Sequence, residues 1–173
     1  MRTEPVDAKK LFASLDETWE ELLHLVSSTN ETLINKIPFK DSWTVAQLAT
    51  HITKSNYGMA KTLEMQGKAA TRDPAEGVPK MKEIFLDFSK KYQSPEFILP
   101  AVKVYNKESV LNDLGKSVEQ LKDEGKSVEL SGLLNVQIFG EVTKLELFYF
   151  ILYHTQRHIR QLKNILKKLG EKQ

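Results

Sequence analysis

Four long stretches of the sequence repeat apolar side chains every three or four residues, and this spacing constrains the fold more than any other feature. The stretches span residues 6–27, 43–66, 109–122 and 142–169. Apolar residues at such intervals lie on one face of an α-helix. A chain of 173 residues is long enough to bury one core against these faces. The sequence therefore predicts an all-α fold, a four-helix bundle, as a single domain over residues 1–173.

Capping residues mark the ends of these predicted helices. Thr44 with Gln47 fits a capping box at the start of the second helix, although Asp41 or Ser42 could cap it instead. Lysines followed by a glycine predict that the last helix stops near Gly170. Each long stretch is therefore expected to be a separate helix.

The connection between the second and third long helices is the longest one. Residues 67–79 contain the glycines and prolines typical of a loop, and residues 80–92 are expected to include a short helix. Residues 94–105 are expected to be irregular or extended. Residues 128–140 form a variable segment to which we assign no helix or strand. None of these segments carries a motif that identifies a substrate.

Three of the four histidines are expected to face the core. At about 100° per residue, His154 and His158 lie one turn apart on the apolar stripe of the last helix. His51 lies at the rim of the buried stripe of the second helix. Its neighbours on that face are small side chains that would leave room for a ligand: Thr44, Ser55, Gly58 and Thr62. His24 projects away from the apolar stripe of the first helix and is expected on the surface.

Buried imidazoles need partners, because uncompensated burial costs on the order of 1–3 kcal/mol each. One interpretation is a hydrogen-bonded polar network inside the core. The other is one metal ion held by His51, His154 and His158, since neutral imidazole is a common metal ligand. Three protein ligands would leave coordination positions open to water or substrate, which is typical of catalytic sites. Gln161 could hydrogen-bond to a ligating histidine, or its amide could be satisfied by the backbone.

Several other chemistries lack support in the sequence. The chain has no cysteine, which excludes thiolate nucleophiles and cysteine-rich metal sites of its own. We find no nucleophile-elbow motif, nucleotide-binding glycine loop or inward pair of carboxylates. A net charge of +2 gives no reason to expect nucleic-acid binding. No stretch approaches the roughly 18–20 apolar residues of a membrane span, and we see no signal peptide, so we expect a cytoplasmic protein.

Two stretches of the chain resemble motifs of DinB/YfiT-like proteins. Residues 41–52, DSWTVAQLATHI, are similar to the opening of their second helix. Residues 139–162, FGEVTKLELFYFILYHTQRHIRQL, are similar to their last helix, with its H-x₃-H-x₂-Q motif, and residues 109–121 add to the likeness. These proteins often carry a His-Pro pair before the FG of the last helix, where this chain has VQIFG, so that additional histidine is absent.

The resemblance implies an antiparallel four-helix bundle, usually a homodimer, with one divalent ion that is often zinc or nickel. Carried over by position, the three metal ligands are His51, His154 and His158, and Gln161 is the glutamine of the motif. Characterised members include thiol S-transferases that use bacillithiol, glutathione or mycothiol, and a thiol-dependent isomerase. Others are described as metal-dependent hydrolases.

Three functions follow as hypotheses. The first is a metal-dependent enzyme that transfers a low-molecular-weight thiol, of the bacillithiol or glutathione type, to a small electrophile; a metal-bound thiol would be the nucleophile. The second is a hydrolase of a small substrate, in which the metal activates water. The third is a bundle that binds a metal or ligand without catalysis. Because no carboxylate base can be assigned for hydrolysis, the sequence favours thiol transfer.

Overall fold

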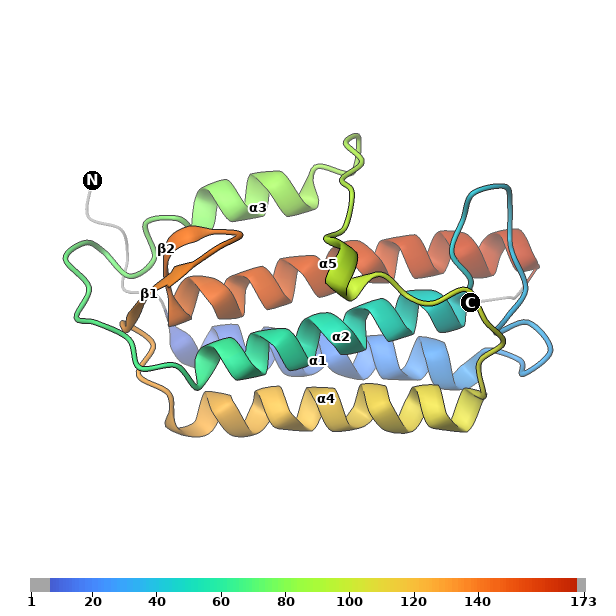
Figure 1. The fold of residues 1–173 in the computed structure, drawn as a ribbon, viewed down its shortest axis with the longest axis horizontal. Helices are drawn as coiled ribbons and strands as arrows, with labels where there is room; N and C mark the ends of the chain where they lie inside the picture. Colours follow the sequence, from blue (N-terminus) through green and yellow to red (C-terminus); the bar gives the residue numbers. More distant parts are fainter. Residues whose placement is uncertain (1–6, 171–173) are drawn as a thin grey trace.

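The computed structural model describes residues 7–170 and contains the expected four-helix bundle (Figure 1). Its long helices are α1 (Ala8–Ser28), α2 (Val45–Leu63), α4 (Lys107–Ser127) and α5 (Lys144–Leu169). The shorter elements are α3 (Val78–Leu86), the 3-10 helix η1 (Glu96–Ile98), and two antiparallel strands, β1 (Leu133–Val136) and β2 (Gly140–Thr143). The predicted fold class is therefore confirmed, with one small hairpin added to the helices.

The four long helices pack so that each has two main neighbours, and one long connection sets their directions. Helix α1 packs against α4 and α5, and α2 packs against the same two helices, so α1 and α2 occupy diagonal corners. Helices α1 and α2 run in opposite directions, as do α4 and α5 (Figure 1). Helices α2 and α4 run in the same direction, because residues 64–106 carry the chain back along the bundle before α4 begins. This long crossover also brings α3 onto α5.

Capping side chains fix the starts of α2 and α5. Thr44 and Gln47 form the capping box expected for α2, with the Gln47 main-chain N–H donating to Thr44 Oγ1 at 3.2 Å. Thr143 and Glu146 form the same motif at the start of α5. Gly170 ends α5 with φ of 81°, a left-handed conformation that glycine adopts without a Cβ clash.

The last helix was expected to begin at residue 142, and the structure corrects this boundary. Val142 and Thr143 belong to β2, where they lie opposite Leu134 and Leu133 of β1. The same hairpin occupies much of the segment to which the sequence assigned no element. The third long helix is longer than expected, because the Asn106 side chain caps it at Lys107 and it continues to Ser127. The second helix, expected to reach residue 66, ends at Leu63.

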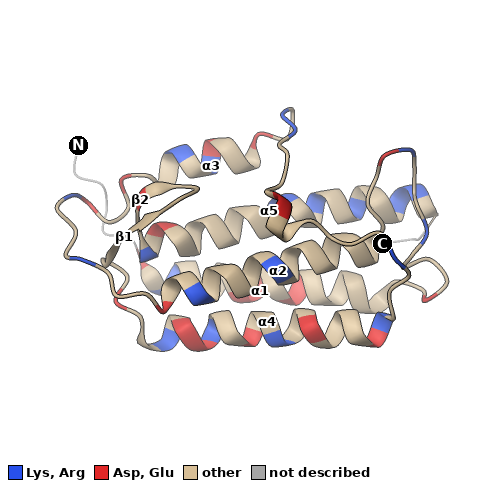
Figure 2. Ribbon diagram, in the orientation of Figure 1, with Lys and Arg blue, Asp and Glu red and all other residues tan. Residues whose placement is uncertain are grey.

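Most charged side chains lie on the outside of the bundle, whereas Lys144 and Glu146 are buried. Figure 2 shows acidic and basic residues interspersed along α4, and mostly basic residues along the C-terminal half of α5. Basic residues near a helix C-terminus are favourable because they face the negative end of the helix dipole. Within residues 7–170, no helix combines the length and apolar content required to cross a bilayer.

The core has two apolar clusters with a polar layer between them. Along α5 the first cluster ends at Tyr153 and the second begins at Ile159. The intervening buried positions of α5 include His154, Thr155 and His158. This break in the apolar packing, halfway along the bundle, contains the candidate site.

Candidate metal centre

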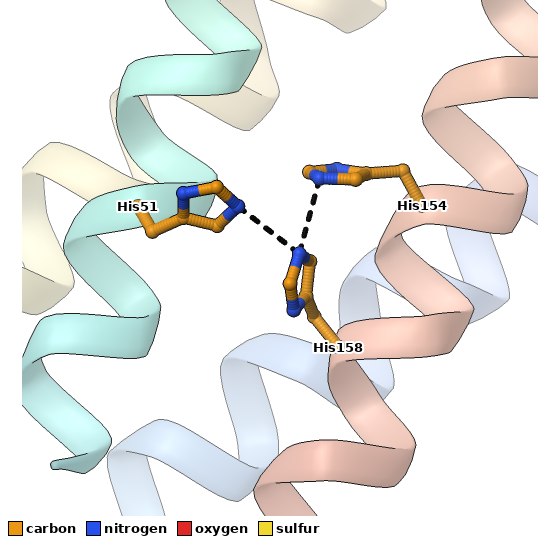
Figure 3. A group of neighbouring side chains, drawn as sticks. All are labelled: His51, His154 and His158. Atoms are coloured by element: carbon orange, nitrogen blue, oxygen red, sulfur yellow. Dashed lines mark hydrogen bonds between the residues drawn. The ribbon is translucent and has the colours of Figure 1, made fainter. Parts of the chain in front are cut away.

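The structure brings together the three histidines that the sequence selected (Figure 3). His51 comes from α2, and His154 and His158 come from successive turns of α5. All three are buried, with exposed fractions of 1%, 8% and 7%. The Nε2 atom of His158 lies 3.1 Å from Nε2 of His51 and 3.0 Å from Nε2 of His154. His24, expected on the surface, is exposed.

Neighbouring groups determine which nitrogen faces the centre in two of the rings, those of His51 and His158. Nδ1 of His51 lies 3.0 Å from the main-chain carbonyl oxygen of Ile98, and a carbonyl only accepts, so this nitrogen carries the proton. Nδ1 of His158 lies 2.9 Å from Oε1 of Gln161 and donates in the same way. Gln161 therefore contacts a histidine of the site, as expected. In both rings the lone pair is left on Nε2, the atom that faces the other histidines.

Aromatic packing orients the rings further. His154 stacks on Phe150 with ring centroids 5.1 Å apart and an angle of 28° between the planes. Trp43 packs against His51 with centroids 4.9 Å apart. The imidazoles are thus held in place by side chains of their own helices and of the segment that precedes α2.

The facing nitrogens form a donor set that fits a metal ion. Because Nδ1 holds the proton in both His51 and His158, their Nε2 atoms have no proton to share across the 3.1 Å contact. Two lone pairs at this distance repel each other unless a cation lies between them. Nitrogens that each bind one zinc ion at about 2.0–2.1 Å with tetrahedral angles lie roughly 3.3–3.4 Å apart. The three ligand nitrogens lie within 4.8 Å of one another, so modest movements of the rings would bring them around one ion.

Burial also keeps the three rings neutral, the form that binds metals. Burial is the main reason why the pKa of His158 falls to about 3, and the nearby His51 and Arg157 lower it further. Burial, followed by the neighbouring imidazoles, holds the pKa of His154 well below its usual value. The pKa of His51 is lowered by burial and by Lys54, although its hydrogen bond to Ile98 opposes this. At neutral pH the centre is therefore a cluster of uncharged donors.

A cavity of about 570 Å³ lies beside the three histidines. Ser55 and Gly58, two of the small residues expected to leave room near His51, line it, whereas Thr44 and Thr62 do not. Most of the wall is apolar and comes from α3, from the crossover and from the hairpin region: Ile84, Phe85, Pro95, Phe97, Ile98, Ile138 and Phe139. One side of the histidine cluster thus faces a space that can hold a small molecule.

Residues 87–102 cover part of this cavity, and we call this segment the strap. Besides the contact of His51 with Ile98, the strap is held by Lys54, whose Nζ donates to the carbonyl of Leu99 at 2.7 Å. Arg157 donates to the carbonyls of Asp87, at 3.1 Å, and Lys90. Main-chain oxygens of the strap are therefore bound directly by side chains of the site.

Lys54 and Arg157 line the cavity, and the sequence interpretation missed both. A signal for them existed, because Lys54 follows His51 by three residues and Arg157 follows His154 by three. On a helix, such a spacing puts the later residue on the same face as the histidine. No aspartate or glutamate lines the cavity within the described part of the chain. The site thus combines neutral metal donors with two cationic side chains.

Comparisons with known proteins agree with this fold. The sequence matches the DinB superfamily over residues 14–162. The uncharacterized protein YuaE of Bacillus subtilis (strain 168) is 26% identical over 156 residues, which cover 88% of this chain and 93% of that protein.

Two solved structures have the same fold. YfiT from Bacillus subtilis, described as a probable metal-dependent hydrolase with an unusual four-helix bundle topology, has a TM-score of 0.63 at 12% identity; the match covers 99% of this chain and 94% of YfiT. TT2238, described as a four-helix bundle protein, has a TM-score of 0.59 at 16% identity; the match covers 91% of this chain and 98% of the TT2238 chain. With the family match extending across most of the helical bundle, this chain belongs to the DinB superfamily.

Proposed function

We propose that this protein is an enzyme that uses one divalent metal ion, zinc or nickel, held by His51, His154 and His158. Its reaction is the transfer of a low-molecular-weight thiol, of the bacillithiol or glutathione type, to a small electrophile. The observation that carries this proposal is the convergence of three Nε2 atoms beside a cavity of about 570 Å³. An ion with an open position there would hold a thiol as thiolate, or lower the pKa of water to about 7.

One feature of the chain favours thiol transfer over hydrolysis: the described wall of the cavity offers no carboxylate that could act as a general base. The absence of cysteine is compatible with thiol transfer, because the sulfur nucleophile would come from a co-substrate. In the transfer, the thiol sulfur bonds to the electrophilic carbon, the leaving group departs with its electron pair, and the thiol proton passes to water.

Hydrolysis of a small substrate is the second candidate. It is supported by the structural likeness to YfiT, which is described as a probable metal-dependent hydrolase. The same three histidines would hold the ion in both reactions. The two candidates differ in whether a thiol or a water molecule takes the open position, and this difference can be measured.

Metal binding is tested first. Protein stripped with a chelator is titrated with Zn²⁺ and, separately, with Ni²⁺ by calorimetry. We expect one ion per chain, and we expect His154→Ala to weaken binding at least about a hundredfold, because it removes one of three ligands. His24→Ala is the matched control, since His24 is exposed and does not line the cavity, and should bind as the wild type does. A stripped wild type that takes up neither ion contradicts both enzymatic candidates.

The choice between thiol and water is tested on cobalt-substituted protein. Bacillithiol or glutathione should add a thiolate-to-cobalt charge-transfer band in the near ultraviolet if either thiol occupies the open position. The same addition to cobalt-treated His154→Ala should produce no such band. A wild-type spectrum that neither thiol changes would rule out transfer of these thiols and leave hydrolysis as the candidate.

A further inference from the structure

We infer that the substrate of this site is an apolar organic anion, with a carbon-rich body in the cavity and an acidic group beside Lys54 and Arg157. That this ligand is a substrate rests on the proposed function. That the cavity binds such a ligand rests only on the residues of the cavity wall.

The lining of the cavity favours a ligand with an apolar body. A volume of about 570 Å³ lies within the range of roughly 300–1,000 Å³ that is usual for small-molecule sites. Four phenylalanine rings border the space, those of Phe85, Phe97, Phe139 and Phe150. These rings offer no hydrogen bonds to replace those that a polar ligand makes in water, so a polar body would lose free energy on binding. Hydrocarbon or aromatic groups have no hydrogen bonds to water to lose, and burying their surface in the cavity is favourable.

The two cationic side chains of the cavity favour a ligand with an acidic group. Lys54 and Arg157 donate some of their N–H groups to main-chain carbonyls of the strap and of α3, which do not neutralise their charges. Neither cation is part of an ion pair within the described residues, and no acidic side chain there lines the cavity. A bound divalent ion would raise the positive charge further, so the cavity favours anions and disfavours cations.

The positions of the two cations link the acidic group to the reactive centre. Each lies one helical turn from a histidine of the site, Lys54 after His51 on α2 and Arg157 after His154 on α5. Side chains three residues apart on a helix have Cβ atoms about 5–6 Å from each other. Both cations also line the same cavity as the three histidines, so an acidic group bound by them lies beside the donor cluster, and the apolar body extends along the phenylalanine-lined wall.

Three probes with one shared body test the inference: 2-naphthalenesulfonate, 2-naphthalenemethanol and the positively charged 2-naphthylmethylamine. Their affinities are measured by calorimetry on metal-stripped and on zinc-loaded protein. We expect the sulfonate to bind at least about tenfold more tightly than the alcohol and the amine to bind most weakly, because opposite charge attracts and like charge repels in a partly enclosed site. Zinc should widen the difference between sulfonate and amine.

Substitutions of Lys54 test whether this residue causes the preference for the anionic probe. Lys54→Met should weaken sulfonate binding about fivefold and leave alcohol binding unchanged, whereas Lys54→Arg should retain sulfonate binding. Lys61→Met is the matched control, because Lys61 is an exposed lysine of the same helix that does not line the cavity. Circular dichroism melting shows whether each variant is folded.

Three results would overturn the inference: an amine that binds as well as the sulfonate, a folded Lys54→Met protein with unchanged sulfonate affinity, or no binding of any probe. Failure of the proposed function gives a different pattern. Then metal uptake or the cobalt–thiol band is missing, while the order of the three probes on stripped protein is unaffected.

Discussion

At the scale of single residues, the contact of Gln161 with His158 determines how the donor set is presented. Gln161 Oε1 accepts from His158 Nδ1 at 2.9 Å, which directs the lone pair of Nε2 toward the other two histidines. Replacing such a partner of a metal-binding histidine typically lowers metal affinity about 10–100-fold. We expect Gln161→Leu to weaken Zn²⁺ binding about tenfold and Gln161→Glu to retain it, in competition titrations with a chromophoric chelator. Equal affinities for Gln161→Leu and wild type would contradict this role.

The lowered pKa of His158 predicts that the metal-free protein is sensitive to acid. With a pKa of about 3 in the folded state and 6.5 as the usual value, the unfolded chain binds more protons between these pH values, so stability falls as pH falls below about 6.5. For this one residue the loss at pH 5 is about 2 kcal/mol. Urea unfolding of metal-free protein at pH 7.5, 6 and 5 measures it, and His158→Gln should show a smaller loss. An equal pH dependence in the two proteins would show that His158 takes up a proton in the folded state.

The sequence predicts the histidines better than the rest of the wall, for a physical reason. The direction of His51, His154 and His158 depends only on counting residues along regular helices, and the structure brings all three together. Lys54 and Arg157 lie on the same helical faces, but their long side chains turn to the cavity because strap carbonyls bind them. The strap has no periodic pattern from which its course could be predicted.

At the scale of elements, the first turn of α5 is tied to the loop that precedes α3. Glu146 is 1% exposed and binds Arg72 through both carboxylate oxygens, each at 2.7 Å. It also accepts from the main-chain N–H groups of Gly77 at 2.6 Å and Thr143 at 2.9 Å. A Cβ atom on Gly77 would lie 2.7 Å from the same carboxylate, so this approach requires glycine. The interaction positions α3, which forms part of the cavity wall.

Removal of the Arg72 side chain should therefore destabilise the protein. Arg72→Met leaves the Glu146 carboxylate buried without its cation, and we expect a loss of about 3 kcal/mol at pH 7 in urea unfolding. Lys126→Met is the control, because Lys126 forms an exposed pair with Asp123, and it should not change stability measurably. An Arg72→Met protein as stable as the wild type would show that the two main-chain donors alone satisfy Glu146.

The same residue predicts a second pH effect. Burial alone would raise the pKa of Glu146, but the hydrogen bonds from Arg72, Thr143 and Gly77 outweigh it and lower the pKa below 4.5. A carboxylate with a lowered folded pKa contributes stability above its unfolded pKa, and this stability is lost as pH falls through the folded pKa. Between pH 5 and pH 3, the wild type should therefore lose more stability than Arg72→Met, as measured by urea unfolding. The opposite order would mean that Glu146 is protonated in the folded protein.

Elements with strong periodicity were predictable, and those fixed by distant contacts were not. All four long helices were expected, because each repeats apolar residues over several turns. The β1–β2 hairpin was not, since each strand has only four residues and too few alternations for a pattern. Thr143 and Glu146 carry a capping-box signature that could have placed the start of α5 correctly. The pairing of Glu146 with Arg72 joins residues 74 positions apart, which local reasoning does not reach.

At the scale of the whole molecule, the three histidines join the two sides of the bundle where its apolar core is interrupted. His51 belongs to α2, and His154 and His158 belong to α5, between the two apolar clusters. His51 also binds the strap through Ile98. A metal ion bound by these residues would therefore connect α2, α5 and the crossover at one point.

Because such an ion binds the folded chain and not the unfolded one, it should raise the thermal stability of the entire protein. Free Zn²⁺ at about 100 times its dissociation constant adds about 2.7 kcal/mol. For a domain of this length, that corresponds to a rise of roughly 5–10 °C in Tm. Differential scanning calorimetry of stripped and zinc-loaded protein measures the shift, which a chelator should reverse. His24→Ala should show the full shift and His154→Ala almost none, whereas an equal shift in His154→Ala would place the stabilising ion elsewhere on the protein.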